Sequence, residues 1–138
     1  FNCSSSPDTF ERELPDQPYV EIRSLAQSVY EVVTAQGIDA AVQHFEQSLD
    51  SKRFYLREDE MNRVGYALLR GNQTPSAVRI FELVAARFPQ SFNAHDSLGE
   101  AYAAAGKKDL AIASYQRSIQ LNPGNTGGIE ALKRLEGK

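Results

Sequence analysis

Leu98-Gly99-Glu100-Ala101-Tyr102 is the stretch of this 138-residue chain that decides the fold, because its surroundings recur at a fixed distance. Residues 34 positions apart share their character at four places: Gly65 with Gly99, Ala77 with Ala111, Phe81 with Tyr115, and Pro89 with Pro123. A fixed period of this length is typical of helical repeat arrays, in which each unit buries its apolar face against its neighbour. The sequence therefore predicts an all-α solenoid, which excludes most enzyme classes for this segment.

The two repeated glycines fall in the middle of predicted helices, where glycine costs about 1 kcal/mol relative to alanine. Gly65 and Gly99 are therefore expected where a neighbouring helix crosses too closely to leave room for a Cβ atom. Phe81 and Tyr115 each follow a repeated alanine by four residues, on the same helix face, and are expected to fill that contact. We interpret all of these as packing residues that carry the fold.

An apolar period of about 3.6 residues predicts helices along most of the chain after Pro18. The predicted helices run over Val20 to Gln36, Asp39 to Leu49, Glu58 to Arg70, Pro75 to Phe88, Phe92 to Ala105, Lys108 to Leu121 and Gly128 to Glu136. Thr74 is predicted as the cap of the fourth helix, with Pro75 at its first position.

The remaining segments carry weaker signals. Residues 1–18 hold three prolines and alternating charges, and they are expected to form an irregular N-terminal segment or linker. The connection over residues 51–57 must bury its apolar residues, Phe54, Tyr55 and Leu56. No segment alternates with period two and β-branched enrichment, so no sheet of consequence is expected.

The repeated residues resemble the tetratricopeptide repeat, a 34-residue helix-turn-helix unit. The last unit matches the pattern through Leu98, Gly99, Tyr102, Ala111, Tyr115 and Pro123, and the middle unit through Val64, Gly65, Ala77, Phe81 and Pro89. The first unit is degenerate, because Ala41 lies 36 residues before Ala77. The resemblance implies a domain over residues 19–138 that folds as an all-α, right-handed superhelix of three helix-turn-helix pairs. Its units would cover about residues 20–57, 58–91 and 92–125, followed by a capping helix over about 127–136.

A second, narrower resemblance concerns the run from Phe88 to Tyr102 and the run from Pro18 to Ala41. Both are similar to the C-terminal repeat module of bacterial β-lactamase-related serine hydrolases. The resemblance implies a non-catalytic protein–protein interaction module that is an accessory part of such a hydrolase, periplasmic or secreted. One alternative is a free-standing, cytoplasmic adaptor that binds an extended peptide. The other is a structural domain that stabilises or gates a missing catalytic domain.

Residues that carry chemistry in other proteins are interpreted here as structural. His95-Asp96-Ser97 combines the residue types of a catalytic triad, but adjacent helix positions point about 100° apart and do not form one. His44 has no second histidine or cysteine at metal-ligand spacing, and Cys3 is the only cysteine. The hydrolase nucleophile pattern Ser-x-x-Lys does not occur. The sequence therefore predicts neither an enzyme nor a cofactor or metal site.

Composition narrows the class of partner. The net charge is −3, without a block of lysine or arginine, so nucleic acid is not expected as a partner. Apolar runs extend over only a few residues, so no membrane span is expected. A protein or peptide is the expected partner.

In arrays of this kind the first helix of each pair lines a concave groove, and its side chains not used for packing are candidates for ligand contact. The candidates are Arg23, Tyr30, Thr34, Asn62, Tyr66, Leu69, Arg70, Asn93, Asp96 and Glu100. Tyrosines and arginines beside amides suit an extended peptide. Replacing Tyr66 and Arg70 together by alanine is expected to weaken a peptide partner with little change in melting temperature. The paired cations that clamp chaperone tails in some family members are absent from the matching positions, so chaperone tails are not expected as ligands.

Overall fold

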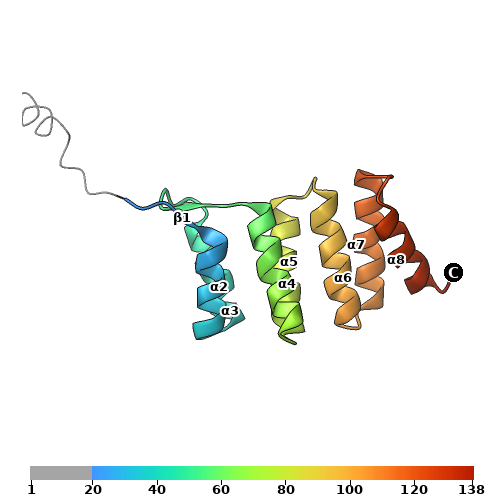
Figure 1. Ribbon diagram of the computed structural model, residues 1–138, viewed down its shortest axis with the longest axis horizontal. Helices are drawn as coiled ribbons and strands as arrows, with labels where there is room; N and C mark the ends of the chain where they lie inside the picture. Colours follow the sequence, from blue (N-terminus) through green and yellow to red (C-terminus); the bar gives the residue numbers. More distant parts are fainter. Residues whose placement is uncertain (1–19) are drawn as a thin grey trace, which may run out of the picture.

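The described part of the chain, residues 20–138 of a computed structural model, is a row of seven helices standing side by side (Figure 1). They form three consecutive pairs and one final helix: α2 (Leu25–Gln36) with α3 (Ile38–Ser48), α4 (Glu58–Arg70) with α5 (Thr74–Arg87), α6 (Phe92–Ala104) with α7 (Lys108–Leu121), and α8 (Thr126–Glu136). The predicted all-α fold of paired helices is confirmed. The predicted N-terminal segment over residues 1–18 lies outside the described residues.

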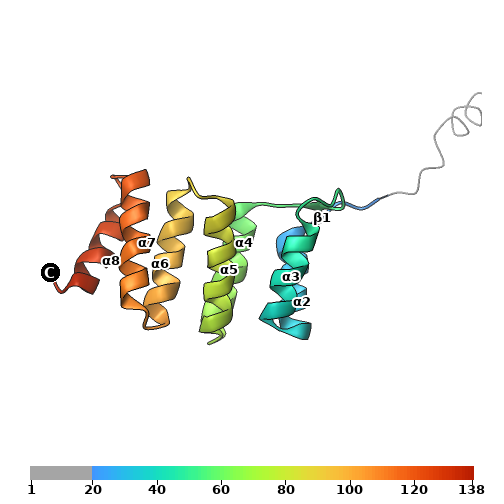
Figure 2. The same cartoon turned by 180° about the vertical axis from the view of Figure 1, so that it is seen from behind.

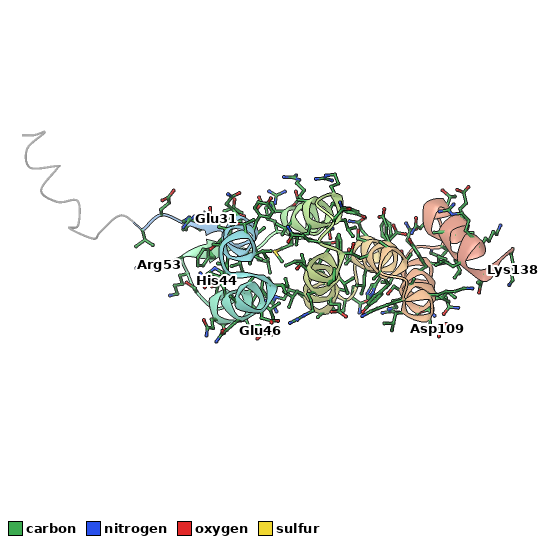
Figure 3. All side chains as sticks on the ribbon, turned by 90° about the horizontal axis from the view of Figure 1, so that it is seen from below. Glu31, His44, Glu46, Arg53, Asp109 and Lys138 are labelled. Atoms are coloured by element: carbon green, nitrogen blue, oxygen red, sulfur yellow. The ribbon has the colours of Figure 1, made fainter. Side chains whose placement is uncertain are left out.

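The pairs stack into two layers, one made of the first helices and one of the second. Turning the molecule brings α3, α5 and α7 to the front (Figure 2), and the view along the helices separates the two layers (Figure 3). In that view Glu31 on α2 marks the side of the first helices, whereas Glu46 on α3 and Asp109 on α7 mark the opposite side. The face formed by α2, α4 and α6 is called the first-helix face below.

Most helix boundaries agree with the sequence prediction. The bounds of α4 and α7 are those predicted, and α3, α5, α6 and α8 differ from the prediction by one or two residues. The predicted cap of α5 is wrong: Gln73 occupies the cap position, and Thr74 is the first helical residue, with Pro75 in the first turn. The reason is that the backbone of Gln73, and not the threonine hydroxyl, begins the helical hydrogen bonding, because the N–H of Ala77 donates to the carbonyl of Gln73.

The start of α2 is the largest departure from the prediction. The helix begins at Leu25 and not at Val20, because Arg23–Ser24 forms a short strand, β1, paired in parallel with β2 (Phe54–Tyr55). Ser24 then caps α2, since its hydroxyl accepts from the backbone N–H of Gln27. The two-residue strand β2 lies in the connection between the first and second pairs, where the repeat spacing is 36 and not 34 residues. Tyr55 on β2 is exposed, contrary to the expectation that it is buried.

The repeated glycines are explained by close packing inside each pair. A Cβ atom on Gly65 would lie 2.4 Å from the ring of Phe81, and one on Gly99 would lie 3.0 Å from the ring of Tyr115. Phe81 is fully buried together with Leu25, Met61, Leu68 and Ile80, so α2, α4 and α5 share one core where the first and second pairs meet. The predicted role of the two glycines and two aromatic residues as packing residues is confirmed.

The final helix closes the array. α8 packs on α7, and its start is capped by Asn125, whose side-chain oxygen accepts from the N–H of Gly128. The Asn125 amide also donates to Asp96 Oδ1 at 2.9 Å and to Ser118 Oγ at 3.0 Å. This cap therefore ties the last helix to both α6 and α7.

Candidate functional site

The predicted contact residues are spread along the first-helix face, but the structure does not present them equally. Five are exposed, three are half-buried and one is buried. The exposed residues are Arg23, Tyr30, Arg70, Asn93 and Glu100, the half-buried ones are Tyr66, Leu69 and Asp96, and the buried one is Asn62. Thr34, near the end of α2, is also exposed. Two contacts between first helices divide this face: the first junction, between α2 and α4, and the second junction, between α4 and α6.

A hollow with a volume of about 560 Å³ opens at the first junction. Its floor consists of small or branched apolar side chains from both helices, Ala26 on α2 with Val64 and Ala67 on α4. Tyr30 and Tyr55 contribute aromatic rings to its lining, and both are exposed. The hollow thus combines an apolar floor with aromatic walls, a pattern typical of sites that take a side chain or a small ligand.

Two arginines line this hollow, and each already contacts a carboxylate outside it. Arg23 Nη2 lies 3.3 Å from Glu31 Oε2, and Arg63 Nη2 lies 3.0 Å from Asp59 Oδ2. Asp59 also accepts from Arg57 Nε at 3.0 Å, and this hydrogen bond is the main reason that the pKa of the Asp59 carboxyl is lowered. All of these ion pairs are solvent-exposed, so each contributes little to stability.

Two carboxylates also line the hollow, and within residues 20–138 neither has a cationic partner. Glu60 is half-buried and accepts hydrogen bonds only from hydroxyl groups, those of Ser24 and, at 3.5 Å, Tyr55. Glu21 is exposed at the edge of the same hollow. The lining therefore includes two carboxylates that form no ion pair with a described side chain.

The second junction is filled by side chains. The hydroxyl of Tyr66 on α4 lies 2.8 Å from Glu100 Oε2 and 2.9 Å from Ser97 Oγ, both on α6. The phenol has one proton and the carboxylate only accepts, so Tyr66 donates to Glu100 and accepts from Ser97. The ring packs edge-on against Phe81, with 5.0 Å between the centroids. Burial raises the pKa of Tyr66 to about 12, so the phenol is neutral at physiological pH.

Asn62 and Asp96, predicted as contact residues, serve the interior of the array. Asn62 is only 6% exposed, and neither atom of its side-chain amide has a hydrogen-bond partner in the described part of the chain. The placement of Asn62 on an accessible surface is therefore wrong, because the residue lies in the packed contact. Asp96 accepts from Asn125 at the start of the final helix, so its carboxylate is already engaged.

The two histidines have structural partners. His44 Nε2 lies 2.8 Å from Ser28 Oγ, and its ring meets Phe54 edge-on. His95 Nε2 lies 2.9 Å from the carbonyl oxygen of Pro89 and so secures the turn before α6. Among residues 20–138 no group of three or more histidine, cysteine, aspartate or glutamate side chains is arranged to hold a metal ion.

Of the residues that line the hollow, sequence reasoning identified only Arg23 and Tyr30. Among those it missed are Tyr55, Glu60 and Ser24. They come from the short strand pair and from the first turn of α4, outside the groove positions of the repeat pattern. One signal was available, because the spacing of 36 residues between Ala41 and Ala77 indicates two additional residues in the interval that contains β2. A length comparison between units would therefore have directed attention to this connection.

Comparisons with known proteins agree with the repeat fold. Residues 63–126 match the family model described as a tetratricopeptide repeat. A MamA mutant is structurally similar with a TM-score of 0.61 at 22% identity, over 82% of this chain and 81% of that chain. The first TPR of Spaghetti (RPAP3), bound to the HSP90 peptide SRMEEVD, is similar with a TM-score of 0.57 at 19% identity, over 82% of this chain and 88% of that one. At these identities the likeness shows the fold alone. A search of curated proteins finds no match, and no helix within residues 20–138 is both long and apolar enough to cross a membrane.

Proposed function

We propose that this chain, which has the tetratricopeptide-repeat fold, is a protein–protein interaction module that binds an extended peptide along its first-helix face. The observation that carries the proposal is the hollow at the first junction, whose lining includes exposed side chains outside the buried core, among them Tyr30 and Tyr55. Tyrosine and arginine side chains beside it offer stacking area and hydrogen-bond donors, as binding hot spots do. A structural neighbour with a bound peptide supports the same use of the fold.

Within this proposal the predicted residues take different roles. Tyr30 and Arg70 are exposed, and neither has a side-chain hydrogen bond to another described residue, so both are free to contact a ligand. Tyr66 connects α4 to α6 through its hydroxyl, so its replacement by alanine would disturb the fold as well as the face. We therefore expect Tyr66→Ala to lower the melting temperature, and we use Tyr30 in place of Tyr66 for the substitution that tests binding.

The test begins with the selection of binders from a phage-displayed library of random peptides, followed by calorimetric titration of the selected peptides. Replacing Tyr30 and Arg70 together by alanine is expected to raise the dissociation constant at least tenfold, because each removes an exposed contact group. The melting temperature should stay within the error of the wild-type value.

The matched control replaces Arg87 on α5 and Leu110 on α7 by alanine, since both are exposed on second helices. This pair should leave affinity unchanged. Failure to select any peptide, or binding that responds to the control pair and not to the first-helix pair, would exclude the first-helix face as the binding surface.

The accessory role beside a serine hydrolase is a second, finer proposal. One observation favours a partner at the N-terminal end of the array: Val20 and Ile22, which lead into β1, are 50% and 62% exposed. The test is to read the coding sequence upstream of Phe1 and to measure hydrolysis if a catalytic domain with a Ser-x-x-Lys nucleophile is found. Replacing Ile22 by aspartate should then lower activity or stability of the whole protein, and an unchanged protein would argue for the adaptor.

A further inference from the structure

We propose that the hollow at the first junction takes the side chain of an arginine or lysine from the bound peptide. This inference rests on the proposed peptide-binding function. The four charged groups that line the hollow differ in whether they form an ion pair. The two cations, Arg23 and Arg63, are paired with carboxylates beyond the lining, whereas the two anions, Glu21 and Glu60, have no cationic partner among residues 20–138.

Glu60 is the group that favours a positively charged ligand over a negatively charged one. Its carboxylate is half-buried and receives hydrogen bonds only from the Ser24 and Tyr55 hydroxyls. Arg57 is close enough to feel the charge of Glu60 but forms its ion pair with Asp59, so a cationic side chain in the hollow would give Glu60 the charge-assisted hydrogen bond that it lacks. An acidic ligand would instead have to displace Glu31 from Arg23 or Asp59 from Arg63 while approaching Glu60.

The walls and the floor suit the same ligand. Tyr30 on α2 and Tyr55 on β2 both line this hollow and are 38% and 42% exposed. Aromatic rings attract a guanidinium or ammonium group over their faces. The floor of Ala26, Val64 and Ala67 offers apolar contact for the methylene stem that arginine and lysine carry below the charged head.

The experiment uses the peptides selected from the random library on the wild-type chain. The selected sequences should share an arginine or lysine at one position. Replacing that residue by its neutral analogue, citrulline or norleucine, and replacing Glu60→Gln in the protein should each weaken binding about tenfold. The two changes together should weaken binding little more than either one alone, because both remove the same ion pair.

Two variants keep the result interpretable. In Glu60→Gln the remaining carbonyl oxygen accepts from one of the two hydroxyls, Ser24 or Tyr55, and the new NH2 group can donate to the other, so the fold should be preserved. Its matched control is Glu46→Gln on the opposite side of the molecule (Figure 3). Ala67→Leu fills the floor of the hollow and should weaken only peptides that carry the basic anchor.

The outcomes separate this inference from the proposed function. Selected peptides without a shared basic residue, or with a shared apolar or acidic one, would overturn the anchor while binding to the first-helix face stands. The same holds if Glu60→Gln and the neutral analogue weaken binding independently. A library that yields no binder would overturn the proposed function and the anchor together.

Discussion

The first and second junctions of the first-helix face share one repeat pattern and are filled differently. At the second junction Tyr66 on α4 reaches Ser97 and Glu100 on α6, and the space between the helices is occupied. At the first junction Tyr30 holds the position that corresponds to Tyr66, yet its hydroxyl has no hydrogen-bond partner among residues 20–138, and a hollow of about 560 Å³ lies beside it.

The neighbouring helix explains the difference. Thirty-four residues before Ser97 and Glu100, α4 carries Arg63 and Tyr66, neither of which offers a carboxylate to the phenol of Tyr30. The tyrosine at the first junction therefore stays exposed, whereas its counterpart is engaged. The comparison teaches that a single repeat position can seal a groove or leave it open, depending on the residue that the following unit presents.

The largest expected loss of stability comes from a substitution that would displace Phe81, the ring on which Tyr66 packs at the second junction. In Gly65→Ala the new methyl group would lie 2.4 Å from the buried ring of Phe81, which in turn supports Tyr66 edge-on. We expect a loss of about 3 kcal/mol in the free energy of unfolding, as in overpacked cores. Urea denaturation followed by circular dichroism measures it.

Gly99→Ala is the matched control for that substitution. Its methyl group would meet Tyr115 at 3.0 Å and above, a contact that a small shift relieves. The expected loss is about 1 kcal/mol, because better helix propensity offsets part of the crowding. Equal losses at the two glycines would mean that both units tolerate the methyl group alike.

A smaller loss of stability is expected when the Tyr66 hydroxyl, which bonds across the second junction, is removed. Tyr66→Phe abolishes the hydrogen bonds to Glu100 and Ser97 and leaves the hydroxyl of Ser97, 1% exposed, without that partner. The expected loss is about 1.5 kcal/mol in the free energy of unfolding. Tyr30→Phe at the first junction should change stability negligibly, and a comparable loss there would contradict the contrast between the junctions.

The repeat period, the glycine–aromatic contacts and most helix ends could be predicted from the sequence, because local periodicity and close packing determine them. Gly65 with Phe81 is the clearest case. The strand pair β1–β2 could not be predicted, because each strand has only two residues and forms through a contact distant in sequence. Pattern reasoning likewise assigned Asn62 and Tyr66 to the first-helix face without revealing that Asn62 is buried and that Tyr66 forms a hydrogen bond across the second junction.

A smaller effect of opposite sign is expected at the buried amide on α4. Asn62→Leu replaces a side chain that has no hydrogen-bond partner in the described chain with an apolar one of similar size, so the desolvated amide is removed. The free energy of unfolding should rise by about 1 kcal/mol. Asn93→Leu, at an exposed position on α6, is the control and should leave stability unchanged. Destabilisation by Asn62→Leu would indicate that the amide has a partner when the protein is in solution.

The smallest effect concerns alkaline pH. Burial raises the pKa of Tyr66, Tyr102 and Tyr115 from 10.0 to about 12. Each phenol is neutral in both states below pH 10, and between pH 10 and pH 12 the unfolded chain loses its protons first, so the stabilising contribution is present below pH 10 and disappears as the pH approaches 12. The melting temperature should therefore fall across this interval, together with a late rise of phenolate absorbance. Tyr66→Phe should reduce that fall in part, because it removes one of the three buried phenols. Tyr30→Phe should leave the fall unchanged, because Tyr30 is exposed. If all six tyrosines of the chain ionised near pH 10 while the helical signal persisted, the second junction would be as open to solvent as the first.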